Sequence, residues 1–380
     1  MVTAVFTLSN SATPLYVHWQ REIGFSNGTL TLVFAAYIAG LLATLLFAGQ
    51  LSDRFGRKPV LFPGLAAAVF SCVLFSFASS VAVLLIARFL TGVAVGAIVS
   101  AGMAAVVDAG GSCHRQSASL AASVAMVSGA GLGPLLAGIL AEGLAQPIVP
   151  IYSIQLVMIG SAFWVAAALP VKGRAGLHQE RFRFRLPGIP AANRLHLACG
   201  ISVFAPGITA TSFLLSLGPS LFAKLLHVAS PLVAGGTACV MFISATGVQF
   251  AMKMLPIRTI FRNGAAATIL SMCFTTVAVT ASSAWALVLA AILAGAGQGL
   301  GQLGGLTLIG LHVPVERRAE ANAVLHIGGY IPAALLPVCS GYLIDVTGLA
   351  TGATIFAVIL SVAAMTAAIF TRARLKANAT

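Results

Sequence analysis

Twelve long apolar runs dominate the chain, and most are separated from the next by a short turn. They lie near 1–19, 30–50, 60–79, 81–107, 117–141, 148–170, 195–222, 230–251, 264–283, 285–311, 319–343 and 349–370. About 20 mostly apolar residues are enough for an α-helix to cross the hydrocarbon core of a bilayer. Helices are expected because lipid offers the backbone no hydrogen-bond partners. The pattern predicts an all-α membrane protein with twelve transmembrane helices.

The two halves of the chain repeat at a constant offset of 203 residues. The matching pairs are Gly92 with Gly295, Gly96 with Gly299, Gly102 with Gly305, Arg115 with Arg318, Ala118 with Ala321, Pro134 with Pro337 and Gly138 with Gly341, and Glu142 aligns with Asp345. An even number of spans in each unit gives both units the same orientation, so we expect two parallel six-helix repeats. The predicted parts are an N-terminal bundle (1–170), a basic cytoplasmic linker (171–194), a C-terminal bundle (195–370) and a cytoplasmic tail (371–380).

Composition and charge place the chain in a membrane. It is 59% hydrophobic and only 8% charged, whereas about a quarter of the residues of a soluble globule are charged. The net charge of +13 does not indicate nucleic-acid binding, because all Lys and Arg residues except Arg21, Lys224 and Arg88 fall in alternate loops and the C-terminal tail. This bias predicts that those loops and the C-terminus face the cytoplasm, against anionic lipid headgroups. We expect a multi-pass protein of a bacterial inner membrane.

The start of the chain is unusual for such a protein. Met1 begins directly inside an apolar run with no basic residue ahead of it, and a signal peptide would need a basic segment there. We expect that the first turns of helix 1 and a short basic tail are absent, and a mis-assigned start codon is one explanation.

A short charged loop, Gly-Gln-Leu-Ser-Asp-Arg-Phe-Gly-Arg-Lys-Pro at 49–59, separates the second run from the third. Its pattern G-x-x-x-D-R-x-G-R-K resembles the signature loop of the major facilitator superfamily, which implies a transporter. The resemblance also implies a conformational switch built from Gly49, Asp53, Arg54, Gly56, Arg57, Lys58 and Asp108. Arg57 would pair with Asp108 at the end of helix 4, and Asp53 would face the positive N-terminus of helix 11. The alternative is an orientation signal with ordinary surface ion pairs worth ~0–1 kcal/mol each.

Arg88 lies within the fourth run, followed at an i+4 spacing by Gly92. A charge at membrane depth is costly and marks a functional position by default. The run resembles the superfamily's helix-4 motif R-x-x-x-G, whose Arg is associated with proton coupling. The alternative is that Arg88 lies near the end of its helix and snorkels to the surface.

Helix 5 contains Gly-Ala-Gly-Leu-Gly-Pro-Leu-Leu-Ala-Gly at 129–138. It resembles the helix-5 motif of drug antiporters, G-x-x-x-G-P-x-x-G-G, at Gly129, Gly133, Pro134 and Gly138, with Ala137 in place of one Gly. Pro bends a helix and Gly lets a neighbouring helix approach. The motif favours export over import, and the alternative is a general packing seam.

Scattered polar residues within the runs are candidates for a substrate cavity, or else for hydrogen bonds that join helices. They are Asn10, Thr13, Tyr37, Gln155, Gln298, Gln302, Asn322, His326 and Tyr330. Asn322, His326 and Tyr330 recur at i, i+4 and i+8, so they share one face of helix 11. No Asp or Glu lies in the middle of a run, which leaves the coupling ion open.

The resemblance therefore implies a secondary transporter of the twelve-helix drug:proton antiporter group. We expect it to export a small, largely apolar drug or metabolite in exchange for protons, with substrate bound near the midplane between the halves. Two alternatives are a proton-coupled uptake symporter for a sugar or other small solute, and a non-transporting paralogue. No phosphate loop, cofactor motif, metal spacing or soluble catalytic domain is visible, so we expect neither an enzyme nor a metal site. We also expect a monomer.

Overall fold

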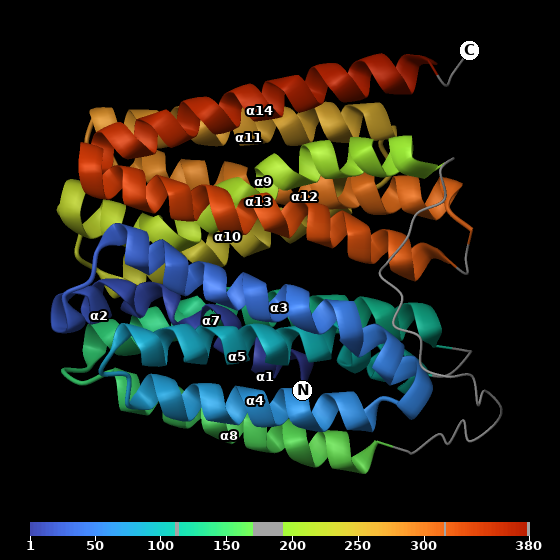
Figure 1. Ribbon diagram of the computed structural model, residues 1–380, viewed down its shortest axis with the longest axis horizontal. Helices are drawn as coiled ribbons and strands as arrows, with labels where there is room; N and C mark the ends of the chain where they lie inside the picture. Colours follow the sequence, from blue (N-terminus) through green and yellow to red (C-terminus); the bar gives the residue numbers. More distant parts are fainter. Residues whose placement is uncertain (111–113, 170–192, 315–316, 378–380) are drawn as a thin grey trace. The chain divides into compact units, whose positions relative to one another are not determined.

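The computed structural model describes residues 1–110, 114–169, 193–314 and 317–377, and every regular element within these ranges is helical. Most of the expected basic linker, 171–194, and the end of the expected tail lie outside the described residues. Helices follow one another along the described sequence from the N-terminus to the C-terminal end, and most of them are long (Figure 1). The first of two stretches of the chain, before residue 170, contains α1 (Val2–Ser11), η1 (Thr13–Leu15), α2 (Tyr16–Ile23), α3 (Asn27–Phe55), α4 (Lys58–Ser76), α5 (Val81–Ala97), η2 (Ile98–Gly102), α6 (Met103–Ala109), α7 (Arg115–Gly143) and α8 (Ile148–Ala168). The second contains α9 (Arg194–Ser220), η4 (Leu221–Leu225), α10 (Pro231–Met252), α11 (Ile257–Thr280), α12 (Ala284–His312), α13 (Arg318–Thr347) and α14 (Leu349–Ala377).

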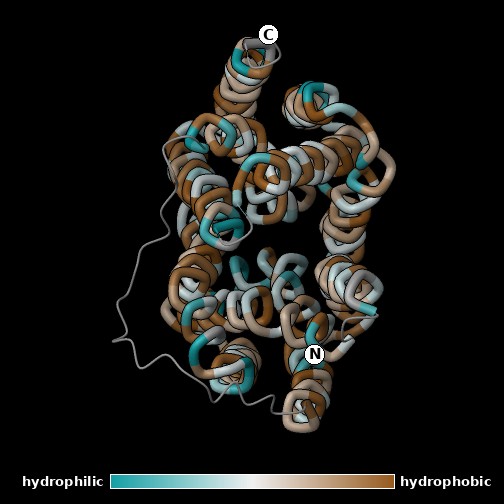
Figure 2. Tube along the Cα trace, turned by 90° about the vertical axis from the view of Figure 1, so that its right-hand side faces the viewer, coloured by the Kyte–Doolittle hydropathy of each residue, from teal (hydrophilic) through white to brown (hydrophobic). Residues whose placement is uncertain are grey.

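Eleven helices in the described residues are long and apolar enough to cross a membrane. They correspond to the second through twelfth runs of the sequence, with α5, η2 and α6 forming one of them. Figure 2, which views the helices nearly end-on, shows brown hydrophobic positions in the helices, with teal and white positions among them. The first run instead forms α1, a short 3₁₀ turn and α2, because Pro14 has no N–H to continue the α-helical hydrogen bonds. A membrane span formed by the first run, and with it the total of twelve spans, therefore stays a prediction.

The chain folds into two compact units. The first comprises Met1–Asn10, Ala36–Gly133 and Ala145–Gly188. Here α4 packs between α5 and α8, which lie beside it in Figure 1. The rings of Phe75 and Tyr152 stack with centroids 4.8 Å apart, and the hydroxyls of Ser71 and Thr91 lie 2.6 Å apart. These contacts join α4 to α8 and to α5.

The second unit comprises Ser11–Ala35, Pro134–Leu144 and Ile189–Thr380. Its central helix is α9, which packs against α12, α13 and α14 and is buried continuously from Pro206 to Ser220. On its flank, α11 packs against α12 and α14. Phe213 of α9 stacks on Phe356 of α14 with ring centroids 4.1 Å apart. The expected division of the chain near 171–194 stays a prediction.

Repeated glycines close the helix contacts in each unit. A Cβ at Gly92 of α5 would overlap the backbone of α3, and a Cβ at Gly295 of α12 would overlap the backbone of α10. One turn further along, a Cβ at Gly299 would overlap the backbone of α10, whereas a Cβ at Gly96 would first meet the side chain of Thr44 in α3. Small residues let backbones pack closely where lipid gives helices no hydrophobic reason to associate. The repeat positions therefore have matching packing roles.

Candidate functional site

The charged loop forms the turn between α3 and α4. The turn passes through Gly56, whose φ of 92° is a left-handed conformation that glycine adopts without strain. A Cβ at Gly49, the first glycine of the motif, would meet nothing within 4 Å among the described residues. Only the second glycine of the motif is therefore used for its geometry in this structure.

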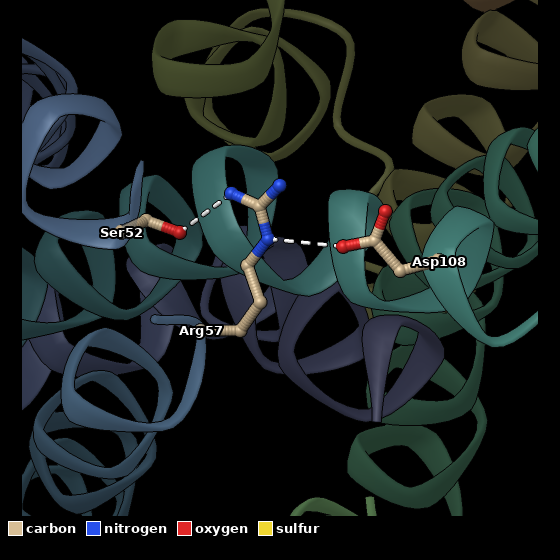
Figure 3. A network of polar contacts seen from close by, with 3 residues as sticks. All are labelled: Ser52, Arg57 and Asp108. Carbon is tan, nitrogen blue, oxygen red and sulfur yellow. Dashed lines mark hydrogen bonds and ion pairs between the residues drawn. The ribbon is translucent and has the colours of Figure 1, made fainter. Parts of the chain in front are cut away.

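Arg57 reaches from this turn to the end of α6, which is the end of the fourth predicted span (Figure 3). Its Nε lies 3.2 Å from Oδ2 of Asp108 in α6, and its Nη1 donates to Oγ of Ser52 at 2.8 Å. The side chains of Arg57 and Asp108 are 32% and 53% exposed, so water weakens their attraction. The structure thus brings together the two residues expected to pair. Ser52 was not foreseen, although its position five residues before Arg57 in the same loop was a usable signal.

The other charged residues of the motif point elsewhere. The Lys58 ammonium donates to the carbonyl oxygen of Ala167 at the end of α8, at 2.8 Å. The guanidinium of Arg54 lies 5.4 Å from the centroid of the Phe55 ring. The side chain of Asp53 lies outside the described residues. Its expected position against the N-terminus of the eleventh predicted span, which is α13, therefore stays a prediction.

Arg88 lies about two turns into α5 and is 0% exposed, so it does not snorkel to the surface. Its Nη1 donates to the backbone carbonyl of Ser9 in α1 at 2.7 Å. Its guanidinium also lies 5.4 Å from the centroid of the Tyr37 ring, within the range of a cation–π interaction. Gly92, one turn later, brings α5 against the Tyr37 backbone. The predicted coupling residues therefore connect α5 to α1 and α3.

The helix-5 motif closes two helix contacts along α7. A Cβ at Gly129 or Gly133 would overlap the backbone of α1, and a Cβ at Gly138 would lie 2.6 Å from the carbonyl oxygen of Pro231 in α10. The carbonyl of Pro134 in turn approaches Gly235 of α10. All four matching positions thus contribute to close packing, which gives the motif a physical role.

The candidate cavity residues of the first unit are Asn10, Tyr37 and Gln155. Asn10 donates to Oγ of Ser9 at 3.1 Å, beside the residue that binds Arg88. Gln155 of α8 is buried, and its Oε1 has no hydrogen-bond partner among the described residues. Tyr37 packs on Arg88. The structure therefore connects Asn10 and Tyr37 to the Arg88 site.

The candidates of the second unit are Thr13, Gln298, Gln302, Asn322, His326 and Tyr330. His326 and Tyr330 of α13 surround Phe204 of α9, with ring centroids 5.8 and 6.4 Å from the Phe204 ring. Buried polar atoms of Gln298, Asn322 and His326 have no hydrogen-bond partner among the described residues. Phe204 was missed because a Phe in an apolar run carries no signal of its own. This aromatic cluster with unsatisfied polar neighbours along α12 and α13 is the best-formed candidate for substrate contact.

A small pocket in the same unit has a cavity volume of about 20 Å³. Apolar side chains of α9, η4, α10 and α12, including Leu214, Phe222 and Met241, line most of it. Thr13 is the one predicted cavity residue in its lining, and its buried Oγ1 has no hydrogen-bond partner among the described residues. The pocket is apolar with a single free hydroxyl.

Membrane-length helices with a buried arginine and a charged helix turn indicate a polytopic membrane protein. Residues 1–284 and 257–379 match the sequence profile described as Major Facilitator Superfamily. The chain belongs to this superfamily and is a transporter rather than an enzyme.

Relatives and solved structures agree with this family. A stretch of 75 residues is 41% identical to "Multidrug resistance protein MdtL" of Escherichia coli O45:K1 (strain S88 / ExPEC), covering 20% of this chain and 19% of that protein. The match thus spans about a fifth of the length of that relative. The crystal structure of nucleoside transporter NupG aligns with a TM-score of 0.75 at 16% identity, over 97% of this chain and 96% of that one. An inward-facing, occupied bacterial homolog of the human lysosomal transporter Spinster aligns with a TM-score of 0.70 at 15% identity, over 99% and 94%. At such identities the structures show the fold alone.

Proposed function

We propose that this transporter exports a small, largely apolar drug or metabolite by alternating access, in exchange for protons. It would act in a bacterial inner membrane with its C-terminus in the cytoplasm, as a monomer with twelve spans. The two six-helix bundles would move around a substrate held near the bilayer midplane.

The close packing of the helix-5 motif in α7 is the observation that supports export as the direction of transport. Gly129, Gly133 and Gly138 each meet a neighbouring helix so closely that a side chain would collide with it. The sequence of this motif resembles that of drug antiporters, and the local identity with a multidrug resistance protein supports the same group. The aromatic cluster at Phe204 suits a largely apolar compound.

Arg88 is the proposed coupling residue. A fully buried guanidinium bonded to a backbone carbonyl is an expensive feature that packing alone does not require. Its positive charge can respond to the protonation of a group that moves near it, and it ties α5 to α1 and to Tyr37. The proposed proton carriers are Asp53, Asp108 and His326.

The charged turn is the proposed switch on the cytoplasmic side. Arg57 and Asp108 would hold this side closed, with Asp53 at the N-terminus of α13, and these contacts would break as the protein opens inward.

Everted membrane vesicles with an imposed pH gradient test the proposal directly. A library of apolar fluorescent compounds is added outside, and we expect at least one to accumulate inside and to leave when a protonophore collapses the gradient. Vesicles that contain Arg88→Gln at equal protein level are the matched control. Accumulation only in right-side-out vesicles would establish uptake instead, and no accumulation in either would favour the non-transporting paralogue.

The second candidate is proton-coupled uptake of a small polar solute. It is favoured by the unsatisfied polar atoms of Gln298, Asn322 and His326, which could bind a polar solute. The same right-side-out vesicles, tested with radiolabelled nucleosides and sugars, distinguish it from export.

A further inference from the structure

Two acidic residues bind the N-termini of helices that are distant in the sequence. Asp345, near the end of α13, accepts hydrogen bonds at the start of α3. Its Oδ1 binds the backbone N–H of Asn27 at 2.9 Å and the Asn27 side-chain amide at 3.1 Å, and its Oδ2 binds the N–H of Gly28 at 2.8 Å. Lys224 also interacts electrostatically with Asp345. A carboxylate at this position is stabilised by the positive end of the α3 dipole.

Glu142, at the end of α7, makes the corresponding contact with α10. Its Oε2 accepts a hydrogen bond from the Ser230 hydroxyl at 2.8 Å and from the backbone N–H of Leu232 at 3.4 Å. Both sites therefore join the last turn of one long helix to the first turn of another. Both lie within the second compact unit.

The two contacts are related by the internal repeat. Glu142 and Asp345 are 203 residues apart, and so are Asn27 and Ser230, the residues that they bind. Four residues before each acid, a glycine brings the helices together. Gly138 approaches the carbonyl of Pro231, and Gly341 approaches the carbonyl of Asn27. The same device of glycine contact and acid therefore occurs twice, whereas the charged turn at 49–59 is intact in one half only.

Local capping does not require these acids. At the start of α3, the hydroxyl of Ser26 already accepts a hydrogen bond from the N–H of Thr29. At the start of α10, Ser230 does the same for the N–H of Val233. The acids come from other helices and add cross-links between elements. Both sites are partly exposed, so water can replace the hydrogen bonds when the helices separate.

We propose that Glu142 and Asp345 form a paired latch that holds α7 to α10 and α13 to α3, on the side of the membrane opposite the 49–59 loop. The latch is closed in this structure and releases when the transporter opens on that side. Glu142 and Asp345 act as positioning residues, since they hold helices and do not contact substrate. This inference rests on the alternating-access function proposed above.

Two buried positions can report the opening. Thr31 of α3 and Ala234 of α10 lie one turn beyond the helix starts, are themselves 203 residues apart, and are 0% and 7% exposed. Thr31→Cys and Ala234→Cys are introduced one at a time into full-length protein whose six native cysteines are replaced. Labelling by a membrane-impermeant thiol reagent is then measured in intact cells, where the side opposite the cytoplasm is accessible.

Neutralising either acid, by Glu142→Gln or Asp345→Asn, is expected to raise the labelling rate at both reporter positions by about three- to tenfold. Opening must separate both helix pairs, so neutralising one acid should also raise the labelling rate at the reporter position of the other pair. Glu22→Gln is the matched control, because Glu22 bonds His18 in α2 and no helix N-terminus in the described residues. Detergent-extracted protein of each variant should elute as a single species, which excludes misfolding.

Unchanged labelling at both positions, or a rise only on the helix that lost its own acid, would overturn the latch and leave simple capping. Labelling needs no substrate, so the result is separate from the proposed function. If the acid variants change the labelling rate but the protein shows no export, only the export proposal is refuted. If the protein exports a compound but the acid variants do not change the labelling rate, only the latch is refuted.

Discussion

The Arg57–Asp108 pair allows the size of the cytoplasmic switch to be predicted. At 3.2 Å, two unit charges attract by about 1.3 kcal/mol in bulk water. Measured exposed pairs are worth ~0.2–1 kcal/mol, because ordering two long side chains costs entropy. With both side chains about a third or more exposed, the pair should add no more than ~1 kcal/mol to the closed state. This corresponds to a shift of at most about fivefold in the conformational equilibrium.

A double-mutant cycle tests this value. Asp108→Asn removes the ion pair, and Arg57→Gln also removes the hydrogen bond to Ser52, which is worth ~0.5–1.5 kcal/mol. We therefore expect Arg57→Gln to lower the initial transport rate more than Asp108→Asn does. The double variant should match Arg57→Gln alone to within about twofold, because the arginine is already gone.

The assay is the initial rate of transport in everted vesicles, at low salt and near 1 M salt. Salt screens exposed charges, so the coupling between Arg57 and Asp108 should shrink at high ionic strength. Glu22→Gln, which removes an exposed acid bonded to His18, should leave the rate unchanged at both salt levels. A coupling energy above ~2 kcal/mol, or one indifferent to salt, would refute the assignment of the switch to a water-exposed ion pair.

Three further outcomes are expected. Asp53→Asn should abolish transport while the protein still inserts into the membrane, as followed by flux and by membrane-fraction immunoblots; wild-type flux would contradict the switch. Arg88→Leu should leave the carbonyl of Ser9 unpaired, at a cost of ~1–3 kcal/mol, and should lower both transport and the melting temperature in detergent. Arg88→Lys should recover only part of the stability, and full recovery by Lys would count against a specific guanidinium role. Gly133→Val should destabilise the fold by ~1–3 kcal/mol or more, because the new side chain collides with the α1 backbone. Gly49→Val places its side chain in open space and should leave the melting temperature unchanged. Similar melting temperatures for the two variants would refute the packing role of Gly133.

Much of the helical framework could be predicted because hydropathy acts locally. The ends of the eleven candidate spans agree with the apolar runs to within about three residues, with three exceptions. The span of α11 begins at Ile257 rather than near 264, and the spans of α13 and α14 end at Thr347 and Leu375 rather than near 343 and 370. Arg258 and Arg262 mark the start of α11 as polar, but long basic side chains extend from a helix end toward water and do not interrupt it. The first run was the least predictable, since one proline changed the hydrogen bonding of a stretch that hydropathy alone describes as uniform.

The site was predictable only in part. The pairing of Arg57 with Asp108 was foreseen because a family pattern identified both residues. Phe204 was not foreseen, because its importance comes from the rings of His326 and Tyr330 on another helix. The environment of Arg88 could not be chosen from the sequence, since the same position near a helix start suits both snorkelling and burial.

The sequence by itself determined that this protein spans a membrane, repeats internally and carries the superfamily's charged turn. These properties depend on run length, composition and spacing, all of which are local. The tertiary structure decided which polar groups meet, because those contacts join residues far apart in the chain. Arg88 binds a carbonyl 79 residues away, Glu142 binds a helix start 88 residues away, and Asp345 binds one 318 residues away. Only helix packing can bring such residues within hydrogen-bonding distance, about 3 Å, of one another.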